Sequence, residues 1–155
     1  MTIFFTILPA KSGEAFLLSE VAMRSKASLG HPSHWLELWR IELEVTEGDI
    51  KKESIFKAVD EQGQIMGFYR LSGRGEKLTL SGFWVLPDQM HQGVGSALYQ
   101  HMLKRAKELK TSSIEWESDP QAAPFYLKMG AKEIGKRVYL IEGHERILPI
   151  FQVQF

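Results

Sequence analysis

The chain has 155 residues, of which 44% are hydrophobic and 25% charged, values ordinary for a globular domain. Its 19 basic residues balance its 19 acidic ones, so neither nucleic acid nor an acidic membrane surface is an expected partner. It contains no cysteine, which excludes disulfides, thiolate metal sites and cysteine nucleophiles. The apolar start lacks a basic flank and is too short to span a bilayer, so we expect a cytoplasmic protein.

The first third of the chain predicts a strand followed by two helices. An apolar run at residues 2–8 indicates the strand, which a proline closes. Apolar stripes predict helices over 14–23 and 33–43, with Ser12 and Ser33 as the expected N-caps.

The remaining elements alternate between strands and helices. A hairpin is expected from strands at 54–60 and 65–71, followed by a central strand at 78–86 and an amphipathic helix at 94–109. A short strand at 113–117, a helix at 120–129 and strands at 134–141 and 147–155 complete the list. We therefore expect residues 1–155 to form a single α/β domain.

A glycine turn joins the central strand to the amphipathic helix and reads Gly93-Val94-Gly95-Ser96. The first amides of a helix lack partners and carry the positive end of its dipole, so an anion can bind there. Two nucleotide motifs fail: no lysine follows Gly95 as in a Walker A loop, and Leu98 replaces the third glycine of a dinucleotide fingerprint. The alternative is that both glycines merely make a tight turn.

Two motifs in the second half of the chain resemble the GCN5-related N-acetyltransferase (GNAT) superfamily. The first combines Val85-x-Pro87 with Gly93-x-Gly95, and the second is Asp119-x-x-Ala122-x-x-Phe125-Tyr126-x-x-Met129-Gly130. The resemblance implies a mixed sheet of six to seven strands, splayed between the fourth and fifth, with about four flanking helices. It also implies acetyl-CoA as cosubstrate.

The resemblance places the acetyl-CoA pyrophosphate on the turn amides and the pantetheine arm beside the fourth strand. The implied cofactor-binding residues are Phe83, Trp84, Val85, His91, Gln92, Gly93, Val94, Gly95, Ser96, Asp119 and Phe125. Met90 departs from the family pattern, because a thioether cannot donate a hydrogen bond to phosphate. Asp119 is also explained as a helix N-cap.

Tyr126 matches the family tyrosine that protonates the departing thiolate, and the resemblance implies that catalytic role. Its alternative is a core aromatic residue beside Phe125. The general base is unassigned. Glu115 and Glu117 share one face of their strand, where each is also explained as a solvated edge residue.

The resemblance assigns acceptor recognition to the first two helices, their connection and the last strands. The candidate substrate residues are Lys26, His31, Trp35 and Glu117. Trp35 and Trp39 are one helical turn apart, so core packing is an alternative for at least one of them. No metal site is expected, because the closest histidine pair, His31-x-x-His34, is better explained by a loop and a helix start.

The resemblance thus implies an acetyl-CoA-dependent N-acetyltransferase that acts on the primary amine of a small molecule or an amino-terminal group. Two alternatives stay open: a non-catalytic module that binds or senses acyl-CoA, and an unrelated nucleotide-binding domain. Among partners we expect a small-molecule amine and, by the same resemblance, a second copy of the chain in a homodimer.

Overall fold

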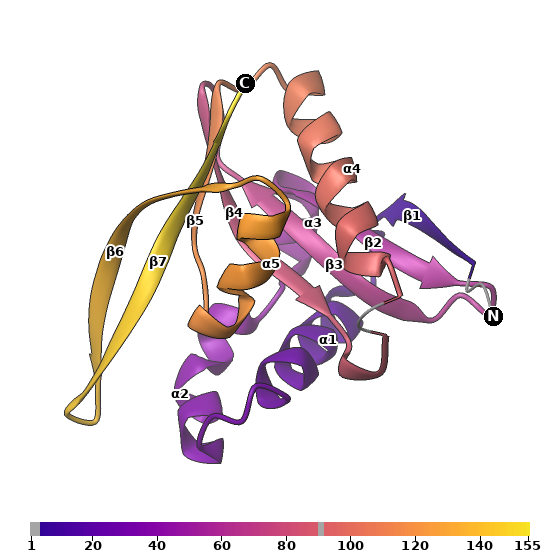
Figure 1. Cartoon of the computed structure of the whole chain (residues 1–155). Helices are drawn as coiled ribbons and strands as arrows, with labels where there is room; N and C mark the ends of the chain where they lie inside the picture. The colour runs from indigo at the N-terminus through magenta and orange to yellow at the C-terminus, as the bar shows by residue number, and fades with distance from the viewer. Residues whose placement is uncertain (1–3, 90–91) are drawn as a thin grey trace.

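A seven-stranded mixed sheet with helices on both faces forms the body of the molecule (Figure 1), and the computed structural model describes residues 4–89 and 92–155. The strands are β1 (Phe5–Pro9), β2 (Ser54–Asp60), β3 (Ile65–Ser72), β4 (Lys77–Val85), β5 (Ser113–Glu117), β6 (Lys132–Ile141) and β7 (His144–Gln154). The α-helices are α1 (Ala15–Ala27), α2 (Ser33–Leu43), α3 (Glu47–Lys52), α4 (Val94–Glu108) and α5 (Ala123–Lys128). Two short 3₁₀ segments are η1 (Pro87–Gln89) and η2 (Pro120–Ala122).

The strand order is β1-β2-β3-β4-β5-β7-β6, and its one parallel pair is β4 with β5. These two strands pair only where Lys77–Thr79 faces Ser113–Glu115. Both strands continue beyond that pairing, and we call the space between their unpaired ends the β4–β5 gap. This confirms the expected splay between the fourth and fifth strands.

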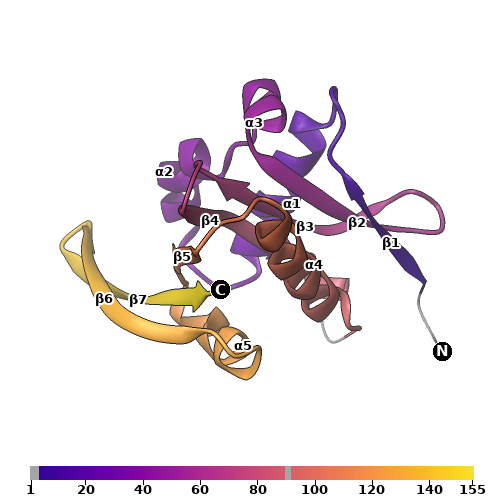
Figure 2. The same ribbon diagram turned by 90° about the horizontal axis from the view of Figure 1, so that it is seen from above.

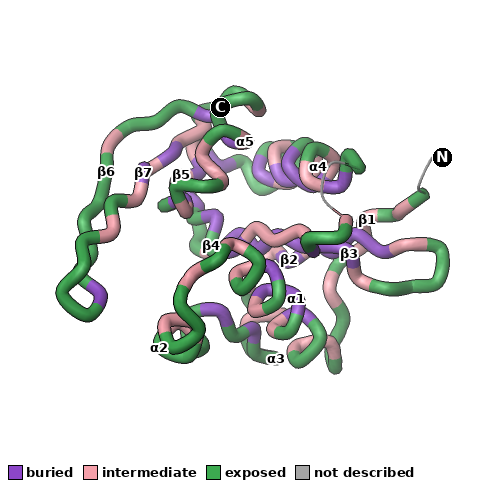
Figure 3. Tube along the Cα trace, turned by 60° about the horizontal axis from the view of Figure 1, so that its bottom comes forward, coloured by how far each residue is buried: buried purple, intermediate pink, exposed green. Residues whose placement is uncertain are grey.

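Two apolar clusters hold the helices on opposite faces of the sheet (Figure 3). On one face α4 buries Val94, Leu98 and Met102 against the strands, at the spacing of one helix face. On the other face α1 buries Leu18 and Val21. None of the helices in the described ranges is long and apolar enough to cross a membrane.

The β6–β7 hairpin extends beyond the rest of the sheet and curves away from it (Figure 2). Only the end of β7, from Ile150 to Gln154, pairs with β5, whereas β6 pairs with β7 along nearly its whole length. The 147–155 segment therefore completes the sheet within the chain. Its projecting part leaves a two-stranded wall beside the β4–β5 gap.

Helix α3 was not predicted, and it explains why the expected Ser12 cap is wrong. The Glu47 carboxylate on α3 accepts hydrogen bonds from the backbone N–H of Gly13 (2.7 Å) and Ala15 (3.2 Å) and from the Ser12 hydroxyl (3.2 Å). Glu47 thus takes the role expected of Ser12, because the free N–H groups at a helix start donate to any well-placed carboxylate. The N-cap position of α2 is Pro32, and Ser33 already lies inside the helix. With α3 the described chain has five α-helices, where about four were expected.

Candidate active site

The glycine turn has the geometry of an anion-binding helix start. Gly93 is the N-cap of α4 with a φ of 85°, in the left-handed region that glycine adopts without cost. The first backbone bond of the helix runs from the Ala97 N–H to the Gly93 carbonyl (3.0 Å), so the amides before Ala97 have no partner in the helix. The first turn of α4 contains no acidic side chain, which keeps its positive dipole end uncompensated.

The second glycine of the turn is required for a different reason. A Cβ atom on Gly95 would lie 3.3 Å from a ring carbon of Phe125 on α5. That contact is tighter than most Cβ atoms make, so a side chain at this position would have to displace the Phe125 ring slightly. Both predicted motifs meet at this contact.

The free edge of β4 directs backbone groups into the β4–β5 gap. The Leu86 N–H donates to the Met66 carbonyl (2.9 Å), which directs the backbone of Leu86 toward β3. Because antiparallel pairing alternates along a strand, the backbone groups of Phe83 and Val85 point into the gap and those of Trp84 toward β3. The Val85 carbonyl accepts a hydrogen bond from the Ser25 hydroxyl of α1 (3.2 Å).

A cavity of about 730 Å³, the smaller cavity, lies between the glycine turn, β4 and α5. Its walls bring together these predicted residues: Phe83, Trp84, Val85, Gly93, Gly95, Ser96, Glu117, Asp119, Phe125 and Tyr126. Val94 lies in the core instead, and the Gln92 side chain donates to the Asp88 carbonyl (3.2 Å). Met90 and His91 lie outside the described residues.

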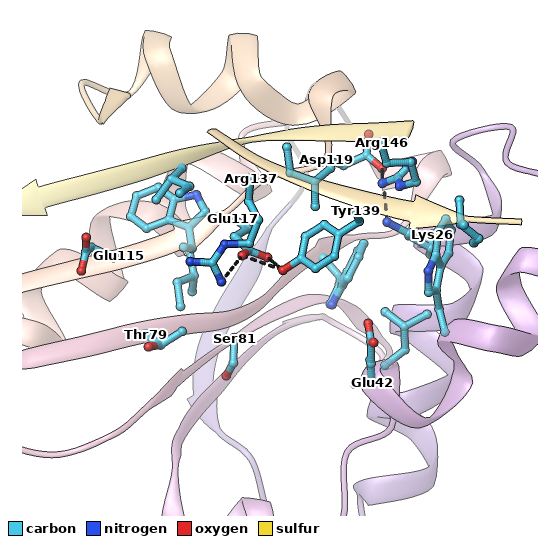
Figure 4. Close-up of a pocket in the computed structure, with 18 of the residues that line it drawn as sticks. Lys26, Glu42, Thr79, Ser81, Glu115, Glu117, Asp119, Arg137, Tyr139 and Arg146 are labelled. Carbon is cyan, nitrogen blue, oxygen red and sulfur yellow. Dashed lines mark hydrogen bonds and ion pairs between the residues drawn. The ribbon is translucent and has the colours of Figure 1, made fainter. Parts of the chain in front are cut away.

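A second cavity of about 890 Å³, the larger cavity, lies between β4, β5, α2 and the β6–β7 hairpin (Figure 4). The two cavities share six lining residues: Leu80, Ser81, Trp84, Trp116, Glu117 and Asp119. They therefore meet at the β4–β5 gap, and we call this meeting point the junction.

Tyr126 stands in the wall of the smaller cavity among aromatic rings. Its ring lies 5.1 Å from that of Trp116 and 5.5 Å from that of Phe151, measured between centroids. Burial raises the pKa of the Tyr126 hydroxyl, which is therefore protonated at neutral pH. Within residues 4–89 and 92–155 that hydroxyl has no hydrogen-bond partner, so its proton is available to a ligand.

Glu117 is held at the junction by two side chains of β6. The Tyr139 hydroxyl lies 2.7 Å from each carboxylate oxygen, and the Arg137 guanidinium lies 3.1 Å from one of them. These three side chains point toward one another in the centre of Figure 4. Glu115, on the same face of β5, lines only the larger cavity and forms an ion pair with Lys77.

Asp119 serves two purposes at the end of β5. Its Oδ1 accepts the Gln121 N–H (3.0 Å), which makes it the N-cap of η2. Its Oδ2 lies 3.2 Å from the Lys26 ammonium and 2.8 Å from the His31 ring nitrogen. Burial alone would raise its pKa, but the Gln121 amide and the Lys26 ammonium hold the pKa of Asp119 below its usual range.

The predicted acceptor residues are only partly brought together. Lys26 and Glu117 line the larger cavity, and His31 contacts it through Asp119. Trp35 packs against Trp39 (5.9 Å between centroids) and lines neither cavity, whereas Trp39 lines the larger one.

Among the basic and polar lining residues that sequence reasoning missed are Lys77, Lys128, Arg137, Tyr139 and Arg146. Arg137 and Tyr139 alternate along β6, so one face of that strand was recognisable, but not its position beside β5. Across residues 4–89 and 92–155, no group of three metal-ligating side chains is gathered.

A mixed sheet that opens between two parallel strands, with a helix start suited to an anion at the opening, is the arrangement that the resemblance to the GNAT superfamily implied. The profile of the acetyltransferase (GNAT) family matches residues 20–131, more than half of the chain. The chain therefore belongs to this family.

Curated relatives and solved structures agree with this assignment. The chain is 34% identical over 99 residues to the peptidyl-lysine N-acetyltransferase YjaB of Salmonella typhimurium and of Escherichia coli. That match covers 63% of this chain and 64% of the Salmonella protein, which is less than two thirds of its length.

The fold is also that of solved N-acetyltransferases. The PaiA N-acetyltransferase of Thermoplasma acidophilum, in complex with coenzyme A, superposes with a TM-score of 0.81 at 18% identity over 99% of this chain and 100% of that one. YncA of Salmonella typhimurium, with acetyl-CoA, gives 0.71 at 14% identity over 97% and 94%. Identities this low show the fold alone.

Proposed function

We propose that the protein transfers an acetyl group from acetyl-CoA directly to the primary amine of a small molecule or an amino-terminal group. The observation that carries this proposal is the meeting of two cavities at the β4–β5 gap. One cavity begins at an anion-binding helix start, and the other is lined by charged side chains. Coenzyme A or acetyl-CoA in two structural neighbours supports the choice of cosubstrate.

The residues of the smaller cavity fit acetyl-CoA. The unpaired amides at the start of α4 suit a pyrophosphate, and Lys128 on α5 lines the same cavity with a positive charge. The backbone groups of Phe83 face the gap, where they can pair with the amides of an extended pantetheine arm as a neighbouring strand would.

At the junction, two side chains have roles in moving protons. The Tyr126 hydroxyl is protonated, lacks a described partner and can donate to the departing thiolate. The Glu117 carboxylate attracts the amine from the larger cavity and accepts its proton as the new bond to the acetyl carbon forms. Direct transfer needs both groups at one point, and both line the smaller cavity.

Glu115 gives a matched control for the role of Glu117, because it lies on the same strand face but lines only the larger cavity. We expect Glu117→Gln to lower kcat/KM for acetyl transfer by about 10² to 10⁴, the usual effect of losing a general base. Glu115→Gln should stay within about threefold of the parent.

The measurement is thiol release from acetyl-CoA with a panel of amines, and mass spectrometry identifies the acetylated product. Equal losses in the two variants would remove Glu117 from the mechanism. If the parent binds acetyl-CoA but releases no thiol with any amine, the protein is instead an acyl-CoA-binding module.

A further inference from the structure

Three basic side chains from separate segments surround one carboxylate at the edge of the larger cavity. Lys26 of α1, His31 of the α1–α2 connection and Arg146 of β7 lie 3.2, 2.8 and 3.6 Å from the same Oδ2 of Asp119. The side chains of Lys26, Arg146 and Asp119 are only 12%, 14% and 7% exposed. We call these four residues the Asp119 cluster; its Lys26, Asp119 and Arg146 are labelled in Figure 4.

The ring of Trp39 on α2 contacts both Lys26 and Arg146 of the cluster. Its ring centroid lies 4.5 Å from the Lys26 ammonium and 4.9 Å from the Arg146 guanidinium carbon. An indole attracts a cation placed over its face, so the ring partly offsets the repulsion between the two. Like charges this close and this sheltered still carry a cost.

Within the Asp119 cluster the basic side chains outnumber the carboxylate. Elsewhere in the cavity Lys77 pairs with Glu115 and Arg137 pairs with Glu117, and Glu42 of α2 adds a further carboxylate to the lining. In the Asp119 cluster two permanent cations and a histidine share a single carboxylate.

The pKa of Lys26 lies below its ordinary value, mainly because the ammonium is buried. Burial lowers the pKa of the ammonium and Arg146 lowers it further, against the opposing effects of Asp119 and the more distant Glu42. Lys26 and Arg146 both line the larger cavity. A bound anion would balance the charge.

From this surplus of basic side chains we infer that the acceptor is an amine that carries a carboxylate in the same molecule, as a free amino acid does. This inference rests on the proposed function and specifies its substrate class. The carboxylate of the acceptor would take the guanidinium of Arg146 and the ammonium of Lys26 as partners, a strong type of hydrogen bond because both sides are charged. Its amine would then lie toward Glu117, which lines the same cavity at the junction.

The test compares each of the proteinogenic L-amino acids with its amide as acceptor, with acetyl-CoA and the full chain. A lysine-containing peptide blocked at both ends is the third type of acceptor. The best free acid should exceed its own amide in kcat/KM by about 10- to 100-fold, the usual effect of a charge-assisted contact. The amide is the less basic amine and has more free base at neutral pH, so basicity cannot produce this preference.

Two variants locate the effect within the cavity. Arg146→Met and Lys26→Met should each reduce the acid-to-amide ratio to within about threefold of one. Lys77→Met should leave the ratio at the parent value, because its ammonium is paired with Glu115. The ratio is measured within each variant, so a partly unfolded sample does not distort it.

The outcomes separate this inference from the function on which it rests. Three results would each overturn the inference: an acid-to-amide ratio near one in the parent, an unchanged ratio in both cluster variants, or a blocked peptide as the best acceptor. The proposed N-acetyltransferase function would still stand in each case. No thiol release with any amine would overturn the proposed function and, with it, the inference.

Discussion

Replacing Tyr126 by phenylalanine should strongly lower activity without lowering the stability of the protein. The substitution removes one hydroxyl and leaves the ring in its contacts with Trp116 and Phe151. The hydroxyl has no partner in the described chain, so its loss breaks no hydrogen bond. Since the ring contacts are kept and no described hydrogen bond is lost, Tyr126→Phe should be at least as stable as the parent.

The effect on catalysis should be large. Loss of a positioned acid lowers the rate by about 10² to 10⁴, or about 3 to 5 kcal/mol in the barrier. Tyr99 is the matched control: it is also buried, with a pKa raised to about 12 by burial, and its ring lies 6.5 Å from that of Tyr126. Unlike Tyr126, Tyr99 lines neither cavity.

The two variants are compared by thiol release and by thermal unfolding. We expect a melting temperature for Tyr126→Phe equal to the parent's or a few degrees higher, since 1 kcal/mol shifts a chain of this length by about 2–4 °C. Tyr99→Phe should retain the parent's activity. Activity of Tyr126→Phe within threefold of the parent, or equal losses of activity in both variants, would refute the acid role.

Two further substitutions test the turn and the Asp119 cluster. Gly95→Val should weaken CoA binding measured by calorimetry, because the first carbon of the side chain would lie 3.3 Å from Phe125 and the rest of the side chain needs further room. Gly135→Val, whose nearest neighbour is 3.8 Å away, should bind normally. Unchanged affinity in Gly95→Val would contradict the turn's role. Asp119→Asn should lower the free energy of unfolding by about 3–5 kcal/mol at pH 7, since it leaves buried cations without their carboxylate. The pKa of Asp119 is lowered in the folded state, so its contribution to stability is present above about pH 4 and is lost as the pH falls further. Urea titrations measure the difference in unfolding free energy between parent and variant. The same difference at pH 7 and at pH 3 would contradict this reasoning.

The parts of the site that depend on local sequence were predictable. The left-handed Gly93, the helix that follows it and the Phe125-Tyr126 pair are each visible in a few consecutive residues. Their meeting was anticipated only through the resemblance to a family. The contact between Gly95 and Phe125 joins residues that are distant along the chain.

The acceptor side could not be predicted in the same way. Its walls come from α1, α2, β5 and the β6–β7 hairpin, and the order β5-β7-β6 follows from long-range pairing that no local pattern specifies. Arg146 reaches Asp119 only because β7 lies next to β5. Similarly, Ser12 looked like a cap from the local sequence. Its actual partner, Glu47, lies on a helix that is distant along the chain.

The most direct test of the account is a crystal structure of the protein with CoA and an amine acceptor. We predict that the pyrophosphate lies on the amides at the start of α4, that the pantetheine arm follows Phe83 along the β4–β5 gap, and that the sulfur lies beside the Tyr126 hydroxyl. The acceptor amine should lie in the larger cavity within reach of Glu117. A CoA molecule bound away from the glycine turn, or an amine and thiol on unconnected surfaces, would contradict the central claim that transfer occurs where the two cavities meet.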